Sequence, residues 1–337
     1  MWKPERRSPR GAQGGFVLAT TVWLLAAIVI GAAFFAERVQ RSRDLTRQHR
    51  QMAQSLIVTE STRSEVLFRL ATTDVSIYGL GPPGQAIALD DRAYKGTGDD
   101  SVRLQDERGL LNVNFPDSGM MSQLLGQFGV PPDRRDPLID TLRDYTDVDD
   151  FRRLNGAEAK QYEEQGLPPP PNDWLTTPYE LRNIIGWRDQ PGLWKTPRFL
   201  QVVSAARLGV FNPNTAPAEV LASLPGSNME IAARLIQQRN LAPLTSWQPI
   251  ADLTGFMPAD QESIAWTPAE HVRITQKARG LPWMLQFSVS LTPTSAVAPW
   301  RIDYYVRGAI DVPLENEKDI ASLPPRVAQP AAEAEAF

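Results

Sequence analysis

An uncharged apolar run near the N-terminus is the strongest pattern in this chain of 337 residues. It extends from Phe16 to Ala36, and Glu37 follows it directly. At about 1.5 Å per helical residue the run spans roughly 30 Å, the thickness of a bilayer's hydrocarbon core. The segment before it is basic, with Lys3, Arg6, Arg7 and Arg10 against Glu5. The positive-inside bias therefore predicts a single-pass helix with residues 1–15 in the cytoplasm and the bulk of the chain outside it.

The helical pattern continues beyond the membrane. No proline or glycine occurs between Glu37 and Leu70, and apolar residues form a stripe there among arginine, glutamine and glutamate. Taken alone, this is a membrane anchor with an amphipathic extension. A removed secretory signal is the alternative, but Phe34-Phe35-Ala36 does not supply its usual cleavage site.

Short alternating segments on both sides of a helical middle predict a sheet. They lie at 87–89, 101–104, 199–203, 271–274, 283–291 and 302–306. Residues 283–291 alternate as in an antiparallel strand with one buried face. We therefore predict an α+β fold: a long N-terminal helix with a pilin-like antiparallel sheet, interrupted by a large inserted helical domain.

The helical middle repeats itself at an offset of 100 residues. Leu111-Asn112-Val113-Asn114 matches Phe211-Asn212-Pro213-Asn214, and each copy leads into an apolar helix, 137–144 or 229–239. Asparagine suits the turn and N-cap before such helices. The pattern predicts two helical units, at about 110–150 and 210–265, that resemble SAM-like or helix-hairpin-helix units.

Composition excludes several classes of site. The chain has no cysteine and two histidines, which excludes disulfides and argues against zinc sites and Ser-His-Asp catalysis. The net charge is −4, and residues 205–280 hold as many acidic as basic side chains. A nucleic-acid partner is therefore not expected, and neither is an enzyme, since no cleft with a nucleophile and base is indicated.

An acidic segment follows the first predicted helix of the middle. It runs from Asp144 to Asp150, and a glutamate returns at Glu158 after the glycine turn at Gly156. Alternating carboxylates of this kind are the oxygen ligands that calcium takes, although the spacing is not that of an EF-hand. A solvated loop whose aspartates cap the next turn is the alternative.

The N-terminus resembles that of a type IV prepilin. A basic leader ends in a glycine, the apolar helix begins with phenylalanine, and the helix runs on into the soluble part. The resemblance implies cleavage between Gly15 and Phe16 by a prepilin peptidase. Most pilins carry glutamate at the fifth mature position, where this chain has Thr20. That glutamate neutralises the buried ammonium of the subunit above, so its absence suits a subunit at the tip of a fibre.

Several further motifs together resemble the type II secretion system protein K family, whose members are minor pseudopilins. The resemblance covers most of 15–308. It rests on the prepilin-like N-terminus and on Glu107–Asn114, Leu138–Asp150, Asn155–Glu158, Glu180–Arg182 and Phe211–Ala216.

The resemblance implies a single-pass protein of the inner membrane that caps the periplasmic pseudopilus and initiates its assembly for export of folded proteins. Expected partners are the minor pseudopilins of classes I and J, the major pseudopilin, the prepilin peptidase and the inner-membrane assembly platform, with the secretin or cargo as further contacts. Calcium is the expected ion, with Asp147, Asp149, Asp150 and Glu158 as ligands. The alternative function is a membrane-tethered helix-hairpin-helix receptor for DNA uptake.

These expectations divide the chain into six segments. They are a cytoplasmic leader (1–15), the pilin helix (16–70), a first part of the sheet (71–109), the inserted helical domain (110–270), a second part of the sheet (271–311) and a disordered tail (312–337).

Overall fold

The first helix is long and unbroken, as the sequence predicts. The computed structural model describes residues 14–98, 100–278, 281–308 and 320–325, and helix α1 spans Gly14–Thr72. It contains one stretch long and apolar enough to cross a membrane. Side chains in the first compact unit, residues 1–54, are mostly exposed from Phe16 on. The basic leader lies, up to residue 13, outside the described residues.

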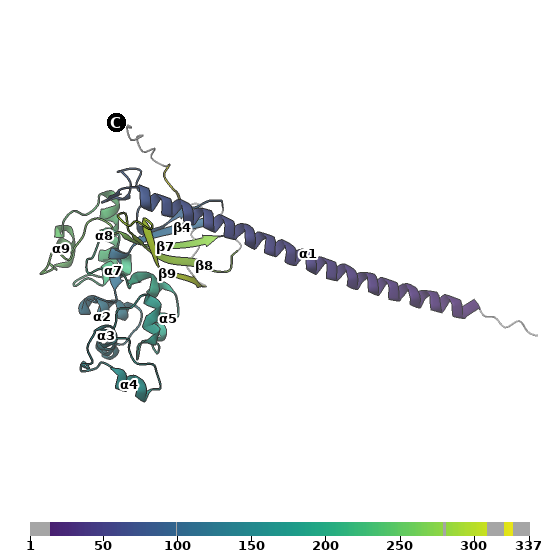
Figure 1. The fold of residues 1–337 in the computed structure, drawn as a ribbon, viewed down its shortest axis with the longest axis horizontal. Coiled ribbons are helices and arrows are strands. Elements are labelled where there is room, and N and C mark those ends of the chain that lie inside the picture. Colours follow the sequence, from purple (N-terminus) through teal and green to yellow (C-terminus); the bar gives the residue numbers. More distant parts are fainter. Residues whose placement is uncertain (1–13, 99, 279–280, 309–319, 326–337) are drawn as a thin grey trace, which may run out of the picture. The chain divides into compact units, whose positions relative to one another are not determined.

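The second compact unit, residues 55–337, contains the main sheet. Of the described strands, six form it in the order β10-β3-β4-β7-β8-β9 (Figure 1). Neighbours are antiparallel except β10 and β3, which are parallel. The bounds are β3 Asp90–Lys95, β4 Asp100–Asp106, β7 His271–Ala278, β8 Met284–Leu291, β9 Trp300–Gly308 and β10 Ala321–Ser322.

Two small pairs of strands accompany the main sheet. Strands β1 (Val75–Ser76) and β2 (Gly79–Leu80) are antiparallel, and β5 (Leu111–Asn112) and β6 (Val203–Ser204) are parallel. The second pair joins the first residues of the predicted repeat to a segment about 90 residues further along.

One face of the main sheet packs against the last turns of α1. Val66, Leu67 and Leu70 of the helix share a buried apolar cluster with Leu104, Ile274 and other sheet residues. Because apolar surface removed from water contributes roughly 25 cal/mol per Å², this cluster is the main term that holds the helix end to the sheet.

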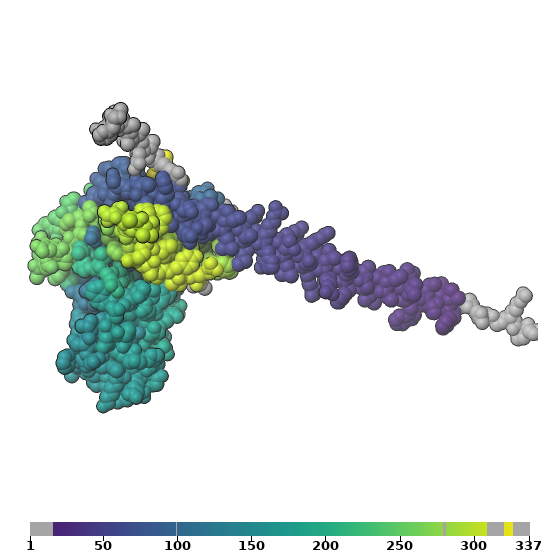
Figure 2. Space-filling view, in the orientation of Figure 1, coloured from purple at the N-terminus to yellow at the C-terminus, as the bar shows by residue number. Residues whose placement is uncertain are grey.

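Helices occupy the chain between β4 and β7, which are neighbours in the sheet. In Figure 2 the teal helical segments gather in one block next to the yellow-green strands. The bounds are η1 Glu107–Gly109, α2 Ser118–Gln127, α3 Pro132–Thr146, α4 Ala159–Glu164, η2 Pro178–Asn183, α5 Pro191–Trp194, α6 Arg198–Val202, α7 Ala218–Ala222, α8 Met229–Leu241 and α9 Gln248–Thr254.

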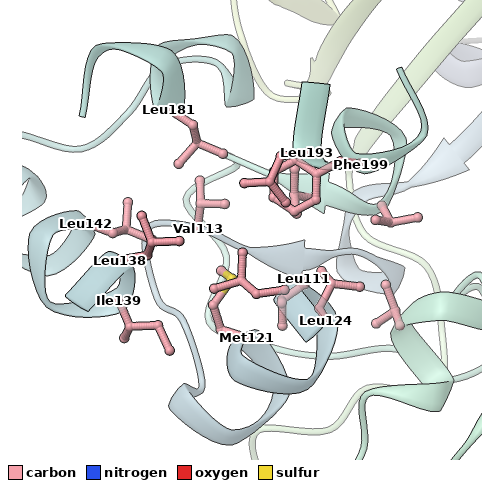
Figure 3. Packing of buried hydrophobic residues seen from close by; sticks show 14 of the residues in the cluster. Leu111, Val113, Met121, Leu124, Leu138, Ile139, Leu142, Leu181, Leu193 and Phe199 are labelled. Carbon is pink, nitrogen blue, oxygen red and sulfur yellow. The ribbon is translucent and has the colours of Figure 1, made fainter. Parts of the chain in front are cut away.

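The helices have an apolar core of their own. Figure 3 shows leucine, valine and methionine side chains of α2, α3 and the β5 region converging with Leu193 and Phe199. Helix α2 packs against α3, α7 against α8, and α2 against α7. The α+β arrangement with a long N-terminal helix is thereby confirmed. The predicted domain boundaries, and the reading of the helices as two SAM-like or helix-hairpin-helix units, stay predictions.

The two Asn-x-Asn motifs make equivalent contacts. The Oδ1 of Asn112 accepts from the N–H of Asn114 at 2.8 Å, and that of Asn212 accepts from the N–H of Asn214 at 3.0 Å. The predicted turn role is thus confirmed in both copies. The predicted N-cap role is wrong in both copies. The side chain of Asp117 accepts from the first turn of α2, and the N-cap of α7 is Pro217, which makes no side-chain capping bond.

The second asparagine of each motif ties the turn to a distant loop. Asn114 accepts from the N–H of Leu175 at 2.8 Å and donates to that residue's carbonyl at 3.0 Å. Asn214 does the same with Leu244, at 2.8 Å in both directions. An amide side chain can satisfy a donor and an acceptor of one peptide at once, which a hydroxyl or carboxylate cannot do as well.

The prediction of a strand at 199–203 was wrong. These residues form α6, and β6 covers only Val203–Ser204. Phe199 lies in an aromatic cluster, 5.3 Å from Phe128 between ring centroids. A short run that is buried on all sides has no periodicity to separate helix from strand.

The prediction of one buried face for 283–291 was also wrong. In β8 the residues from Met284 to Ser290 are all buried. The polar face is covered by side chains of the helical block, since Gln286 binds Gln201 at 2.8 Å and Ser288 binds Glu107 at 2.5 Å. Alternation indicates which face is polar, not whether that face meets water.

The predicted disordered tail is corrected for its described residues. Ala321 and Ser322 pair with β3, which would otherwise be the edge strand of the sheet, and Leu323 packs on the sheet core. Arg69 of α1 also donates to the carbonyl of Pro324 at 2.8 Å. An edge strand offers free backbone groups, so even a weakly apolar segment can pair with it. The remaining residues from 312 to 319 and beyond 325 lie outside the described part.

A buried carboxylate connects the sheet to the helical block. Asp106, at the end of β4, is fully buried and caps η1. It accepts from the side chains of Asn212 at 2.9 Å and Thr215 at 2.8 Å, and from the backbone N–H groups of Arg108 at 3.1 Å and Ala269 at 3.0 Å. Burial raises the pKa of Asp106, and these four donors oppose that shift.

Replacement of this carboxylate is expected to destabilise the fold strongly. Asp106→Ala leaves the buried amide of Asn212 and the N–H of Ala269 without an acceptor, at a cost of about 3 kcal/mol in the free energy of unfolding. The measurement is urea unfolding of the full chain in detergent. The control is Asp74→Ala, an exposed position that should change stability by less than about 0.5 kcal/mol. Equal effects in the two variants would contradict the role of Asp106.

A second buried acid makes stability depend on pH. Asp100 begins β4 and is 2% exposed, and its Oδ1 has no hydrogen-bond partner among the described residues. Burial raises its pKa to about 6, although Thr62 and the N–H of Ser101 bind the charged form. The folded pKa lies above the ordinary value, so the stabilising contribution is complete below about pH 4 and is lost as the pH rises through 6.

Asp100→Asn is therefore expected to be more stable than the parent chain at pH 8, by up to about 2 kcal/mol, and nearly equal to it at pH 4. Urea midpoints between pH 4 and 8 measure the difference. A difference that does not change with pH would contradict the assignment.

Candidate functional site

The predicted assembly positions lie in the first turns of α1. Gly15 and Phe16 lie in the first turn of α1, and Phe16 is 77% exposed. Thr20 lies one turn further along the helix. The hydroxyl of Thr20 donates within the helix, to the carbonyls of Phe16 at 3.0 Å and Val17 at 2.9 Å. A neutral side chain bound to its own helix supplies no charge to a neighbouring ammonium. Cleavage after Gly15 stays a prediction.

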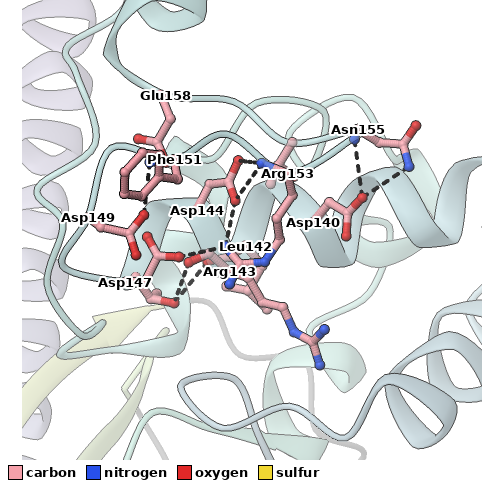
Figure 4. Close-up of polar contacts among 12 residues, drawn as sticks. Asp140, Leu142, Arg143, Asp144, Asp147, Asp149, Phe151, Arg153, Asn155 and Glu158 are labelled. Carbon is pink, nitrogen blue, oxygen red and sulfur yellow. Dashed lines mark hydrogen bonds and ion pairs between the residues drawn. The ribbon is translucent and has the colours of Figure 1, made fainter.

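The acidic loop lies between α3 and α4, at the end of the helical block far from the strands (Figure 1). Figure 4 shows Arg153 reaching between two carboxylates. Its Nη1 is 2.7 Å from Oδ1 of Asp144 and 2.5 Å from Oδ2 of Asp147. Asp144 is fully buried on the last turn of α3, so the arginine compensates a charge that water cannot reach.

Two of the four predicted ligands serve the loop's own structure. Oδ1 of Asp149 accepts from the N–H of Phe151 at 2.8 Å, as in an Asx turn. Oδ1 of Asp150 accepts from Nδ2 of Asn172 at 2.9 Å. Both carboxylates are exposed, which is what the alternative of a solvated, capped loop predicts.

Glu158 differs from them because it is buried and unsatisfied. It is 6% exposed at the start of α4, and neither carboxylate oxygen has a hydrogen-bond partner among the described residues. Oδ1 of Asp147 is likewise buried without a partner. Burial, and then the charges of Asp144, Asp147 and the two following aspartates, raise the pKa of Glu158 to about 7. Three orphan carboxylate oxygens indicate a local excess of negative charge.

The carboxylates do not converge on one point. Within the described part of the chain, no group of three acidic or histidine side chains is arranged to hold a metal ion. The oxygens of Asp147 and Glu158 that lack a hydrogen-bond partner belong to carboxylates, which are the ligands that a hard cation such as calcium prefers. Of the four predicted ligands, Asp147 and Glu158 are the two that have a buried carboxylate oxygen without a hydrogen-bond partner among the described residues.

Sequence reasoning missed three features of this loop. Asp144 and Arg153 carry its central ion pair, and Gly156 lets the backbone pass the Asp144 carboxylate, where a Cβ would lie 1.8 Å from Oδ2. The burial of Asp144 at a helical position was available from the periodicity of α3; the contact with Arg153 was not. The loop also exposes three large apolar side chains by more than four-fifths: Val148, Phe151 and Leu154.

Comparison with known protein families shows to which family this chain belongs. Two family models, both described as type II secretion system (T2SS), protein K, match residues 103–191 and 211–272. The first match contains the end of β4, Asp106 and the acidic loop, and the second contains α7 to α9 and the residues at 212, 215 and 269 that bind Asp106. The chain belongs to the type II secretion system protein K family. This membership makes it a minor pseudopilin.

Relatives of the protein K family agree with this assignment. The type II secretion system protein K of Pectobacterium carotovorum subsp. carotovorum is 26% identical, over 76% of this chain and 84% of that protein. Among solved structures, a chain of the GspK-GspI-GspJ complex from the type 2 secretion system of enterotoxigenic Escherichia coli is similar, with a TM-score of 0.52 and 13% identity. The likeness covers 80% of this chain and 99% of that chain, and at this identity it shows the fold.

Proposed function

We propose that this protein caps the tip of the periplasmic pseudopilus and initiates its assembly, together with minor pseudopilins of classes I and J. The observation that carries the proposal is Thr20. A subunit below another one needs a negative charge at this position, and a hydroxyl bound to its own helix provides none. The similar chain of known structure comes from a GspK-GspI-GspJ complex, which supports partners of the same kind here.

The proposed mechanism is mechanical. After cleavage at Phe16, α1 anchors the chain in the inner membrane and joins a bundle of pseudopilin helices. Addition of subunits below raises the helical domain, inserted between β4 and β7, towards the secretin and exported proteins. The assembly platform and its energy source lie elsewhere, so this chain acts without chemistry of its own. The DNA-uptake alternative gains nothing from the structure, because the segment with α7 and α8 is electrically balanced.

Processing is testable at the N-terminus. Co-expression of the full chain with a prepilin peptidase should move the N-terminus to Phe16, which mass spectrometry detects as loss of residues 1–15. Gly15→Leu should block the cut, because the bulky side chain alters the residue at the scissile bond, whereas Gly14→Ala is the matched control and should be processed. An uncut parent chain would exclude prepilin processing.

Assembly is testable by co-purification. The full chain in detergent should form a defined ternary complex with the class I and J pseudopilins, measured by size-exclusion chromatography with light scattering. Thr20→Glu should leave the complex intact, since nothing above the tip requires that residue. A lone monomer in the presence of both partners would count against the tip role.

Calcium binding at the acidic loop is a further proposal. Asp147 and Glu158 would hold the ion with their unsatisfied oxygens, with Asp149 and Asp150 as further ligands. A bound calcium ion supplies a compact double positive charge that these oxygens share. It would relieve the buried, uncompensated carboxylate of Glu158, which Arg153 does not contact.

Millimolar calcium is therefore expected to raise the melting temperature of the full chain, and Glu158→Gln should lose most of that rise. Without calcium, Glu158 contributes stability at acid pH that is lost as the pH rises through about 7, since its folded pKa is raised. The glutamine variant should lack this loss. Asp133→Asn, on an exposed side chain of α3, is the control and should respond to calcium as the parent does. A parent chain whose melting temperature ignores calcium would refute the site.

A further inference from the structure

A cavity of about 520 Å³ lies between residues 77–92 and the C-terminal end of α8. Much of its lining is small or apolar, including Gly84, Ala86 and Ala88. Charged side chains come from two places, Asp90 and Arg92 at the start of β3 and Arg239 in the last turn of α8. This volume is in the range of pockets that hold small ligands or a few residues of a peptide.

Arg239 is buried and has no ion-pair partner among the described residues. It is 9% exposed, and its Nη1 donates to the carbonyls of Pro213 at 2.7 Å and Ala216 at 2.6 Å. Its Nε is buried and has no partner, and Arg239 forms no ion pair with any residue that the structure describes. Burial lowers its pKa to about 10 against the attraction of Asp90, so the guanidinium remains charged at neutral pH.

Asp90, the acidic side chain among the described lining residues, already forms an ion pair with Arg92. Both carboxylate oxygens of Asp90 bind Arg92, at 2.7 Å to Nε and 2.5 Å to Nη2. Such a two-point contact satisfies one arginine and leaves little for a second. Among the described lining residues, the positive charge of Arg239 is therefore in excess.

A structural role explains only some of the contacts of the Arg239 side chain. The two carbonyl contacts hold the turn at 213–216, which a neutral donor could also do. They do not account for an orphan Nε, or for a buried full charge at the wall of a cavity. A buried ion without its partner costs several kcal/mol unless another group compensates it.

We propose that this cavity binds the carboxylate of a peptide, with Arg239 as the anchoring cation. The planar guanidinium matches a carboxylate in shape, and its two carbonyl contacts hold it in one orientation before the ligand arrives. One excess positive charge balances a monoanion. A phosphate dianion would bring a second charge towards Asp90, which would repel it. The inference does not depend on the tip role proposed above.

The test uses the full chain in detergent and N-acetylalanine as the probe, observed by ligand NMR. We expect saturable binding of this acid at millimolar concentration, and none of the neutral N-acetylalaninamide up to about 10 mM, as suits a fragment held by one charge. Inorganic phosphate should bind more weakly than the acid. Equal binding of acid and amide, tighter binding of phosphate, or no binding of the acid would each overturn the proposal.

Variants locate the binding in this cavity. Arg239→Gln and Ala86→Leu should each weaken N-acetylalanine at least tenfold, the first by removing the charge and the second by filling the space. The second variant keeps the test decisive if the first fails to fold. Arg234→Gln is the control, because this exposed arginine of the same helix pairs with Glu230 at 2.6 Å. Unchanged binding in Ala86→Leu would overturn the location.

A longer probe distinguishes the C-terminus of a peptide from a free small acid as the source of the carboxylate. A tetra-alanine peptide with a free C-terminus should bind more tightly than N-acetylalanine, because its further residues cover the apolar lining. The same peptide with an amidated C-terminus should lose that affinity. A tetrapeptide that binds no more tightly than N-acetylalanine would overturn the peptide as the ligand and indicate a free small acid.

Discussion

The Asp106 carboxylate is the contact on which the arrangement of the second unit depends. It lies where β4 ends and the helices begin, and it accepts from Asn212 and Thr215 at the start of the second helical segment and from the backbone before β7. One side chain thus holds together the two points where the helical block leaves and re-enters the sheet. Burial of a carboxylate is costly unless its oxygens are satisfied, so the position of Asp106 also determines the partners around it.

The next residue extends this junction over the sheet. Glu107 is buried and accepts from Ser204 of β6 and Ser288 of β8, while Arg273 of β7 donates to the carbonyls of Leu200 and Gln201. The sheet therefore has two different buried faces. One is apolar and packs on α1, and the other is polar and packs on the helices. The polar contact is directional, which favours a single orientation of the helical block on the sheet.

The molecule handles buried charge in three ways. Asp106 is satisfied by four hydrogen-bond donors, Asp144 is paired with Arg153, and Arg239 and Glu158 have no ion-pair partner among the described residues. Asp106 and Asp144 have structural roles, because their partners belong to the fold. The last two lie at a cavity and at an acidic loop, where a group from outside the chain can complete them. Uncompensated burial thus separates candidate sites from structural ion pairs more clearly than charge alone.

Local patterns were enough for the long helix, the strands β4, β7, β8 and β9 and the repeated Asn-x-Asn turns, because each depends on neighbours within a few residues. They were not enough for α6, for the strand β10, or for the burial of the polar face of β8, which depend on segments about 80 to more than 200 residues apart in the sequence. The acidic residues of the loop could be named from the sequence by themselves. Only the tertiary structure decided which of them is paired, because Arg153 folds back on Asp144 and Asp147 and leaves Glu158 without a partner among the described residues.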